Sequence, residues 1–165
     1  MKLRIAEIKN VIGKSLEFEL ENGVKNLEFA GETLAFSVPI KVLGKVENVG
    51  DRVFQVDGLI KAVIEVPCYR CLSKAQARLE IDFSQNYSDM PEDEEIASFS
   101  GDEIELLPQV LNEIILNLPG QILCNPDCRG LCLNCGINLN KEVCECVKEK
   151  IDPRLEVLKK LLNRD

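Results

Sequence analysis

Cysteine is the residue type in this chain best suited to chemistry, because its eight copies are clustered and there is no histidine. Six of them follow one another closely, as Cys124-x3-Cys128-x3-Cys132-x2-Cys135-x8-Cys144-x-Cys146. Gly136 comes directly after one Cys-x2-Cys pair, where a glycine lets backbone amides turn toward a thiolate-bound ion. Without imidazole, a tight site must use thiolates alone or thiolates with carboxylates. The pattern indicates a metal site.

Cys68 and Cys71 form a separate Cys-x2-Cys pair directly after Pro67. On a hairpin turn such a pair points both sulfurs to one side and can supply half of a zinc site. Two alternatives stay open. If the pair does not bind metal, it is either two reduced thiols in a turn or a redox pair. The redox version lacks the βαβ setting of thioredoxin-like motifs.

The cellular compartment decides between metal and disulfides. The first residues of the chain carry charges and contain no apolar signal-peptide core, and no later stretch is long and apolar enough to span a bilayer. We therefore expect a cytoplasmic protein, in which thiols stay reduced and a dense cysteine array holds zinc.

An iron–sulfur cluster is the competing metal centre. The spacing Cys128-x3-Cys132-x2-Cys135 matches the three-cysteine motif of radical enzymes. Such enzymes need most of a barrel of about 200 residues or more around the cluster. Here only residues 136–165 follow the motif. Four thiolates around zinc need much less scaffold.

The spacing also predicts which cysteines share an ion. One all-thiolate site is expected from the two half-sites that a short loop can close at small entropic cost, namely Cys132, Cys135, Cys144 and Cys146. The second site is expected to combine the remaining cysteines, Cys124 and Cys128 with Cys68 and Cys71. One or two zinc ions would then be bound, and the second would join the C-terminal segment to the rest of the protein.

The first half of the chain has the pattern of antiparallel strands. Apolar residues alternate with polar ones, or β-branched residues accumulate, over 16–20, 34–46, 53–66 and 75–87. Turn residues separate these runs, and Asp57-Gly58 is read as a bulge inside a strand. Strands this close, with no helix between them, predict a meander or a small barrel. The Cys68/Cys71 pair falls in the turn between the last two strands.

An acidic loop and a helix follow the strands. Residues 89–101 are rich in Pro, Ser, Asp and Glu, with Glu92-Asp93-Glu94-Glu95 at the centre, and are expected to be a mobile loop. Apolar residues then recur at helical spacing over 106–118, which predicts a helix packed on the sheet. Asp152 and Pro153 are good first residues for a short C-terminal helix with one apolar and one basic face.

These elements predict an α+β fold in three parts. Residues 1–88 form an antiparallel β domain that carries the Cys68/Cys71 knuckle, 89–123 form the acidic loop and packed helix, and 124–165 form a cysteine-rich zinc knuckle with a short helix.

Charge is uneven along the chain. The net charge is −8, and residues 85–123 hold nine acidic and no basic residues. Aromatic residues make up 5% and there is no Trp, which argues against a stacking platform for bases. If RNA is contacted, we expect the contact on the C-terminal segment and the first knuckle, through Arg129, Lys141, Lys148, Lys150, Arg154, Lys159, Lys160 and Arg70. The acidic segment would instead attract a basic protein.

Several motifs carry a resemblance to a known family. They are Pro67-Cys68-Tyr69-Arg70-Cys71-Leu72, Leu116-Asn117-Leu118-Pro119, the run 128–140, Cys144-Glu145-Cys146 and Ile151-Asp152-Pro153-Arg154-Leu155. Together they resemble the large-ribosomal-RNA accumulation protein family, also called YceD-like. The resemblance covers nearly the whole chain, strongly over 113–161 and loosely over the N-terminal strands.

The resemblance implies a role in synthesis, processing or stability of large-subunit ribosomal RNA in a bacterial cytoplasm, with no enzymatic activity. The expected partner is that RNA or a basic ribosomal protein, and no small-molecule substrate or membrane is implied. The residues agree, because four thiolates leave zinc no open position and no histidine is available as a general base. The alternative is a thiol redox or metal-sensing protein that uses Cys68 and Cys71.

Overall fold

A computed structural model of the protein describes residues 1–29, 31–91 and 93–146. The short helix expected after Asp152 lies outside these residues. No helix in the described part of the chain is long and apolar enough to cross a membrane.

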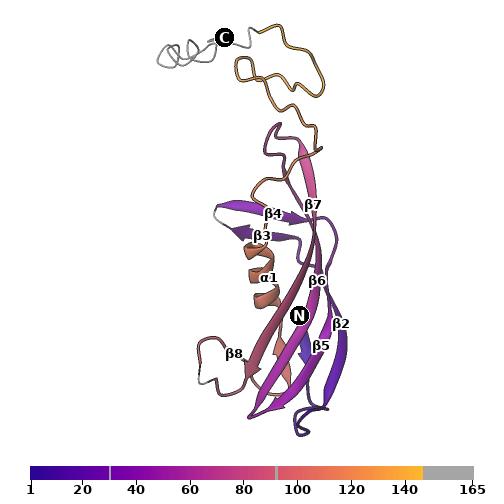
Figure 1. The fold of residues 1–165 in the computed structure, drawn as a ribbon, viewed down its shortest axis with the longest axis vertical. Coiled ribbons are helices and arrows are strands. Elements are labelled where there is room, and N and C mark those ends of the chain that lie inside the picture. The colour runs from indigo at the N-terminus through magenta and orange to yellow at the C-terminus, as the bar shows by residue number, and fades with distance from the viewer. Residues whose placement is uncertain (30, 92, 147–165) are drawn as a thin grey trace, which may run out of the picture.

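One large sheet dominates the described structure (Figure 1). Its strands are β2 (Ser15–Asn22), β3 (Asn26–Phe29), β4 (Glu32–Phe36), β5 (Ile40–Gly50), β6 (Val53–Pro67), β7 (Lys74–Ser88) and β8 (Ala97–Ser98). Strands β6 and β7 pair over their whole length and form the axis of the molecule. All pairs are antiparallel except that of β7 with β8.

Two strands share one side of β6. The lower part of β6 pairs with β5, which in turn pairs with β2, whereas the upper part pairs with β4 of the β3–β4 hairpin. The run 34–46, predicted as one strand, is therefore divided between β4 and β5. The division falls at 37–39, where Pro39 has no N–H to continue a ladder.

Alternation along the strands explains why only one face of the sheet is buried. On β7, Leu79, Ile81 and Phe83 are buried, while the residues between them are exposed. Helix α1 (Leu107–Leu116) covers this face through the fully buried Val110 and Ile114. A small second sheet of β1 (Lys2–Arg4) and β9 (Glu103–Glu105) belongs to the same core. The prediction of an antiparallel sheet with one packed helix is confirmed.

Of the two predicted sheet arrangements, the meander is found and the barrel is not, and one further detail of the prediction is wrong. The meander β5–β6–β7 exists, but the sheet does not close into a barrel, because β2 is an edge with no second strand neighbour among the described residues. No bulge lies at Asp57-Gly58, where the ladders with both neighbours run without a shift. The shift instead falls at Asn48/Gly50, beside the turn that connects β5 to β6.

Gly58 has a different role from the one predicted. It lies opposite Gly44 on β5, in a row that continues to Phe18 on β2 and Phe83 on β7. A Cβ at Gly44 would lie 2.2 Å from the carbonyl oxygen of Asp57, and one at Gly58 would lie 2.7 Å from the Phe83 ring. The two strands therefore approach too closely for any side chain, and the aromatic rings occupy the space beside the glycines.

The close approach of β5 and β6 predicts that a methyl group at position 44 destabilises the protein. Gly44→Ala should lower the free energy of unfolding by about 2 kcal/mol or more, because the clash is with backbone that cannot turn aside. Gly23→Ala is the matched control, since nothing lies within 4 Å of its Cβ position. It should stay within about 0.5 kcal/mol of the parent in urea unfolding. Equal stability of the two variants would contradict the packing described here.

Candidate metal centres

The eight cysteines lie in two groups of four. The first comprises Cys68, Cys71, Cys124 and Cys128, and the second comprises Cys132, Cys135, Cys144 and Cys146. Within each group all four sulfur atoms lie within 4.8 Å of one another. These are the two sets that the spacing predicts. The spacing typical of radical enzymes is not used as one site, because Cys128 belongs to the first group while Cys132 and Cys135 belong to the second.

The sulfur separations fit a tetrahedral ion. Zinc–sulfur bonds of about 2.3 Å place neighbouring sulfurs of a tetrahedron about 3.8 Å apart. Cys68 and Cys128 are separated by 3.8 Å and Cys71 and Cys124 by 3.5 Å. In the second group Cys135 and Cys144 are separated by 3.8 Å, and Cys144 and Cys132 by 3.3 Å. All eight cysteines are free thiols.

The first group joins segments far apart in the sequence. Cys68 and Cys71 lie in the turn between β6 and β7, and the other two cysteines belong to the segment that runs from α1 back to this turn (Figure 1). The Tyr69 N–H donates to the Ile122 carbonyl at 2.9 Å, and the Leu131 N–H donates to the Arg70 carbonyl at 3.1 Å. These bonds align the two segments on either side of the sulfurs.

Burial differs sharply between the groups. Cys68 is 0%, Cys128 3% and Cys71 5% exposed, and with Ala75 they form a small core separate from the main one. The second group is exposed at Cys135 and half-buried at its other members. The fourth member of the first group, Cys124, is exposed. The first group is therefore buried at three of its four cysteines, and the second group is buried at none.

Both Cys-x2-Cys turns have the same backbone geometry. The Leu72 N–H donates to the Cys68 carbonyl and the Gly136 N–H donates to the Cys132 carbonyl, each at 2.9 Å. Leu72 has φ = 59° and Gly136 has φ = 72°, so the residue after the second cysteine is left-handed in both turns. Gly136 adopts this conformation freely, but Leu72 adopts it at a cost of about 1 kcal/mol.

Backbone N–H groups favour the thiolate at the first cysteine of each turn. Burial raises the pKa of Cys68, but N–H groups, chiefly that of Cys124, outweigh this effect and lower its pKa to about 6. N–H groups, above all that of Cys135, lower the pKa of Cys132 to about 6. One ligand of each group is thus ready to ionise near neutral pH.

Each group also holds a thiol whose ionisation is disfavoured. The hydrogen bond with the Cys71 sulfur raises the pKa of Cys124 to about 12, and that with the Cys144 sulfur raises the pKa of Cys146 to about 12. Four sulfurs this close cannot all ionise without a cation. Because thiolates are the metal ligands, a bound divalent ion would compensate their charge and displace the remaining protons.

Asn140 is a contributor that the sequence reasoning missed. Its Nδ2 lies 3.3 Å from the Cys128 sulfur, and its Oδ1 accepts the Arg129 N–H at 2.8 Å. It comes from the loop of the second group and so couples the two groups. The only sequence signal for Asn140 was its position in the short run between Cys135 and Cys144. Such a position does not reveal where a side chain points.

The predicted RNA-contact residues are only partly described. Arg129, which directly follows Cys128 of the first group, and Lys141, which lies between Cys135 and Cys144 in the sequence, are both exposed. Arg70 is exposed too, but its guanidinium donates to the Cys128 carbonyl at 2.9 Å and therefore helps to hold the first site. The other predicted residues, Lys148, Lys150, Arg154, Lys159 and Lys160, lie outside the described part of the chain.

Comparisons with known proteins agree with these motifs. Residues 56–162, which include all eight cysteines, match the family model described as large ribosomal RNA subunit accumulation protein YceD. An uncharacterized protein of Mycobacterium tuberculosis is 30% identical over 125 residues, 72% of this chain and 59% of its own length. The chain thus spans between about half and three fifths of the mycobacterial relatives that it matches.

Two further relatives differ in coverage. The uncharacterized protein YlbN of Bacillus subtilis is 28% identical over 170 residues, 100% of this chain and 98% of that protein. A Zea mays protein named large ribosomal RNA subunit accumulation protein YCED homolog 1, chloroplastic, is 27% identical over 127 residues, 56% of this chain and 43% of its own. No solved structure matches the chain.

The grouping predicts metal stoichiometry. Native mass spectrometry should find two zinc ions per chain. Cys128→Ala and Cys144→Ala should each lose one ion, because each removes a ligand from a different group. Absence of zinc from the parent would contradict both sites, and one ion per chain would contradict the pairing.

The turn geometry predicts an asymmetric response at Leu72. Leu72→Gly should retain zinc against a competing chelator at least as well as the parent, because glycine adopts the left-handed conformation without strain. Leu72→Val should retain it less well, since β-branched residues tolerate this conformation worst. Leu133→Val is the control, because Leu133 is fully exposed and its φ is not positive. A loss of zinc by Leu72→Gly would refute the shared turn.

Proposed function

The chain belongs to the YceD family of large ribosomal RNA subunit accumulation proteins, and from this we propose that it is a non-catalytic factor for the synthesis, processing or stability of large-subunit ribosomal RNA. Two structural zinc ions would order its cysteine-rich end. The match over 56–162, which covers both cysteine groups, is the observation that carries the proposal.

A structural role for zinc follows from the donor set. Four thiolates complete a tetrahedral shell and leave no position for water or substrate. The first group has three almost fully buried cysteines, and its sulfurs join the β6–β7 turn to the segment after α1. The proposal places the protein in the cytoplasm, where these thiols stay reduced.

The structure gives the redox alternative little support. Cys68 and Cys71 are buried, and each lies beside a cysteine of another segment. Reactive thiols are partly exposed. The lowered pKa of Cys68 serves metal binding as well as it would serve redox chemistry.

The acidic segment 85–123 is less free to attract a partner than its composition indicates. Four of its carboxylates pair with cations of the first half of the chain: Asp89 with Arg52, Asp102 with Lys9, Glu103 with Lys2 and Glu105 with the Met1 ammonium. The loop acids Asp93, Glu94 and Glu95 have no ion pair among the described residues. RNA contact would therefore use the cations of the C-terminal segment, and a basic ribosomal protein would meet the loop.

Charge variants test this division. Reversing Lys148, Lys150, Lys159 and Lys160 should weaken binding to large-subunit ribosomal RNA and flatten its salt dependence, because fewer counterions are released. Neutralising Glu92, Asp93, Glu94 and Glu95 should leave or improve RNA affinity and weaken binding to a basic ribosomal protein. Loss of RNA binding by the acidic-loop variant alone would reverse the assignment.

Copurification tests the functional class itself. The tagged full-length protein should be recovered with precursors of the large subunit and not with mature ribosomes. Recovery free of ribosomal particles, together with unchanged levels of large-subunit ribosomal RNA when the protein is depleted, would rule out the proposed function.

A further inference from the structure

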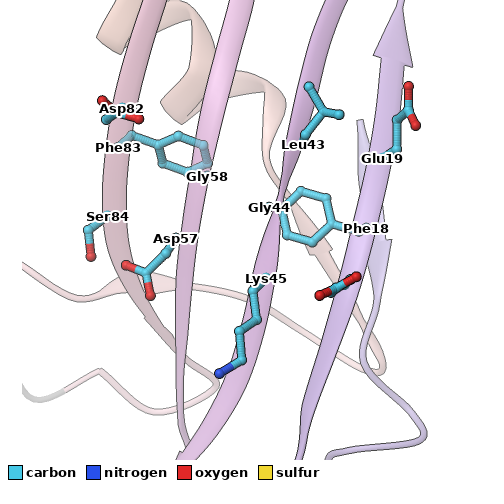
Figure 2. A pocket seen from close by; sticks show the side chains of 11 residues that line it. Phe18, Glu19, Leu43, Gly44, Lys45, Asp57, Gly58, Asp82, Phe83 and Ser84 are labelled. Atoms are coloured by element: carbon cyan, nitrogen blue, oxygen red, sulfur yellow. The ribbon is translucent and has the colours of Figure 1, made fainter.

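The outer face of the sheet carries a shallow trough that crosses four strands. Its volume is about 1050 Å³. Its floor is the backbone row through Gly44 and Gly58, where the strands lie closest, and its walls are the side chains one residue before and after that row. Figure 2 shows Glu19, Lys45, Asp57 and Asp82 extending from β2, β5, β6 and β7.

The charges of the trough are not balanced. Glu17, Glu19, Asp57 and Asp82 line it, and none of these has an ion pair within the described residues. Its one cation, Lys45, contacts Glu47 on its own strand at 2.6 Å. Lys45 also lies directly opposite Glu17 across the β2–β5 ladder. Glu21, the next glutamate along β2, lies outside the trough, and its charge is neutralised by Lys41 at 2.6 Å. The trough therefore holds more carboxylates than cations.

Strand β2 borders this trough and has a free edge. It pairs with β5 along one side, and its other side makes no backbone hydrogen bond within 1–29, 31–91 and 93–146. Leu16, Phe18 and Leu20 lie only half-buried on the core-facing side. An edge of eight residues with half-covered apolar side chains is a template for one more strand.

Charge decides which strand can occupy this edge. In an antiparallel pair, directly opposite residues share a face of the sheet. If two copies paired through β2 with their core faces aligned, glutamates of one copy would lie opposite glutamates of the other, which is destabilising. RNA would meet the same carboxylates. A strand with Lys or Arg at alternate positions would instead place cations opposite Glu17, Glu19 and Glu21.

We propose that β2 binds, by strand addition, an extended segment of a cationic protein in which Lys or Arg alternates with apolar residues. The cations lie over the outer face and reach into the trough, and the apolar residues extend the cover over Leu16, Phe18 and Leu20. This surface goes beyond the proposed function, because it requires neither the metal sites nor contact with RNA.

A peptide experiment on the zinc-loaded full chain tests the proposal. The probe is a capped peptide with the alternating sequence KVKIRVK, and its control is KKRKVIV, which has the same composition in two blocks. Binding of the alternating peptide should slow amide exchange within 15–22, as new backbone bonds form along β2. The Glu17→Lys, Glu19→Lys double variant should bind it about tenfold more weakly, because two attractive pairs become repulsive.

The Glu28→Lys, Glu80→Lys double variant is matched in charge and lies away from the β2 edge. It should bind within about twofold of the parent. Amide protection across β6 and β7 checks that both variants are folded. Equal binding of the blocked peptide, unchanged exchange in 15–22, or equal losses in the two variants would overturn the proposal, as would protection of this edge by an RNA oligonucleotide.

Discussion

The far end of this protein depends on one constraint, the closure of four sulfurs between the β6–β7 turn and the segment that follows α1. The main core is formed by the sheet, α1 and the small β1–β9 sheet. Beyond it, the separate small core contains only three cysteines and Ala75, with Ile122, Leu123 and Leu131 packed against it. So little apolar surface cannot offset the conformational entropy of ordering residues 122–146. Under the proposal that both groups bind zinc, metal–thiolate bonds would supply the missing free energy, since a bound ion stabilises the folded state alone.

The two longest strands carry half of this group of sulfurs. Strands β6 and β7 extend past their neighbours and end in the turn that carries Cys68 and Cys71. A rigid two-stranded ladder is thus what positions half of the first site. The first site in turn fixes the start of the loop that holds the second, and Gly130 marks this junction. It has φ = 74°, and a Cβ there would lie 3.0 Å from the Arg70 carbonyl oxygen. The order of dependence therefore runs from sheet to first group to second group.

The sequence predicted the parts that local rules govern. Cysteine spacing indicated both thiol groups, because a thiolate site needs its ligands in close pairs and only a few pairings close short loops. Apolar periodicity placed the helix to within two residues at each end. Registers between distant strands were beyond reach, because no local pattern says that β4 and β5 share one side of β6. For the same reason the Gly44–Gly58 contact, the outer trough and the role of Asn140 were missed. Ion pairs such as Asp89 with Arg52 likewise join segments whose proximity only the fold determines.

The most direct test of this account is hydrogen exchange before and after removal of metal by a chelator. Exchange should rise across the turn 68–73 and across 124–146, while β5 and the paired middle of β6 and β7 stay protected. Restoring zinc should restore protection. Unchanged exchange at the turn and in 124–146 after complete metal removal would contradict the claim that thiolate–metal bonds, and not apolar packing, order this end of the protein.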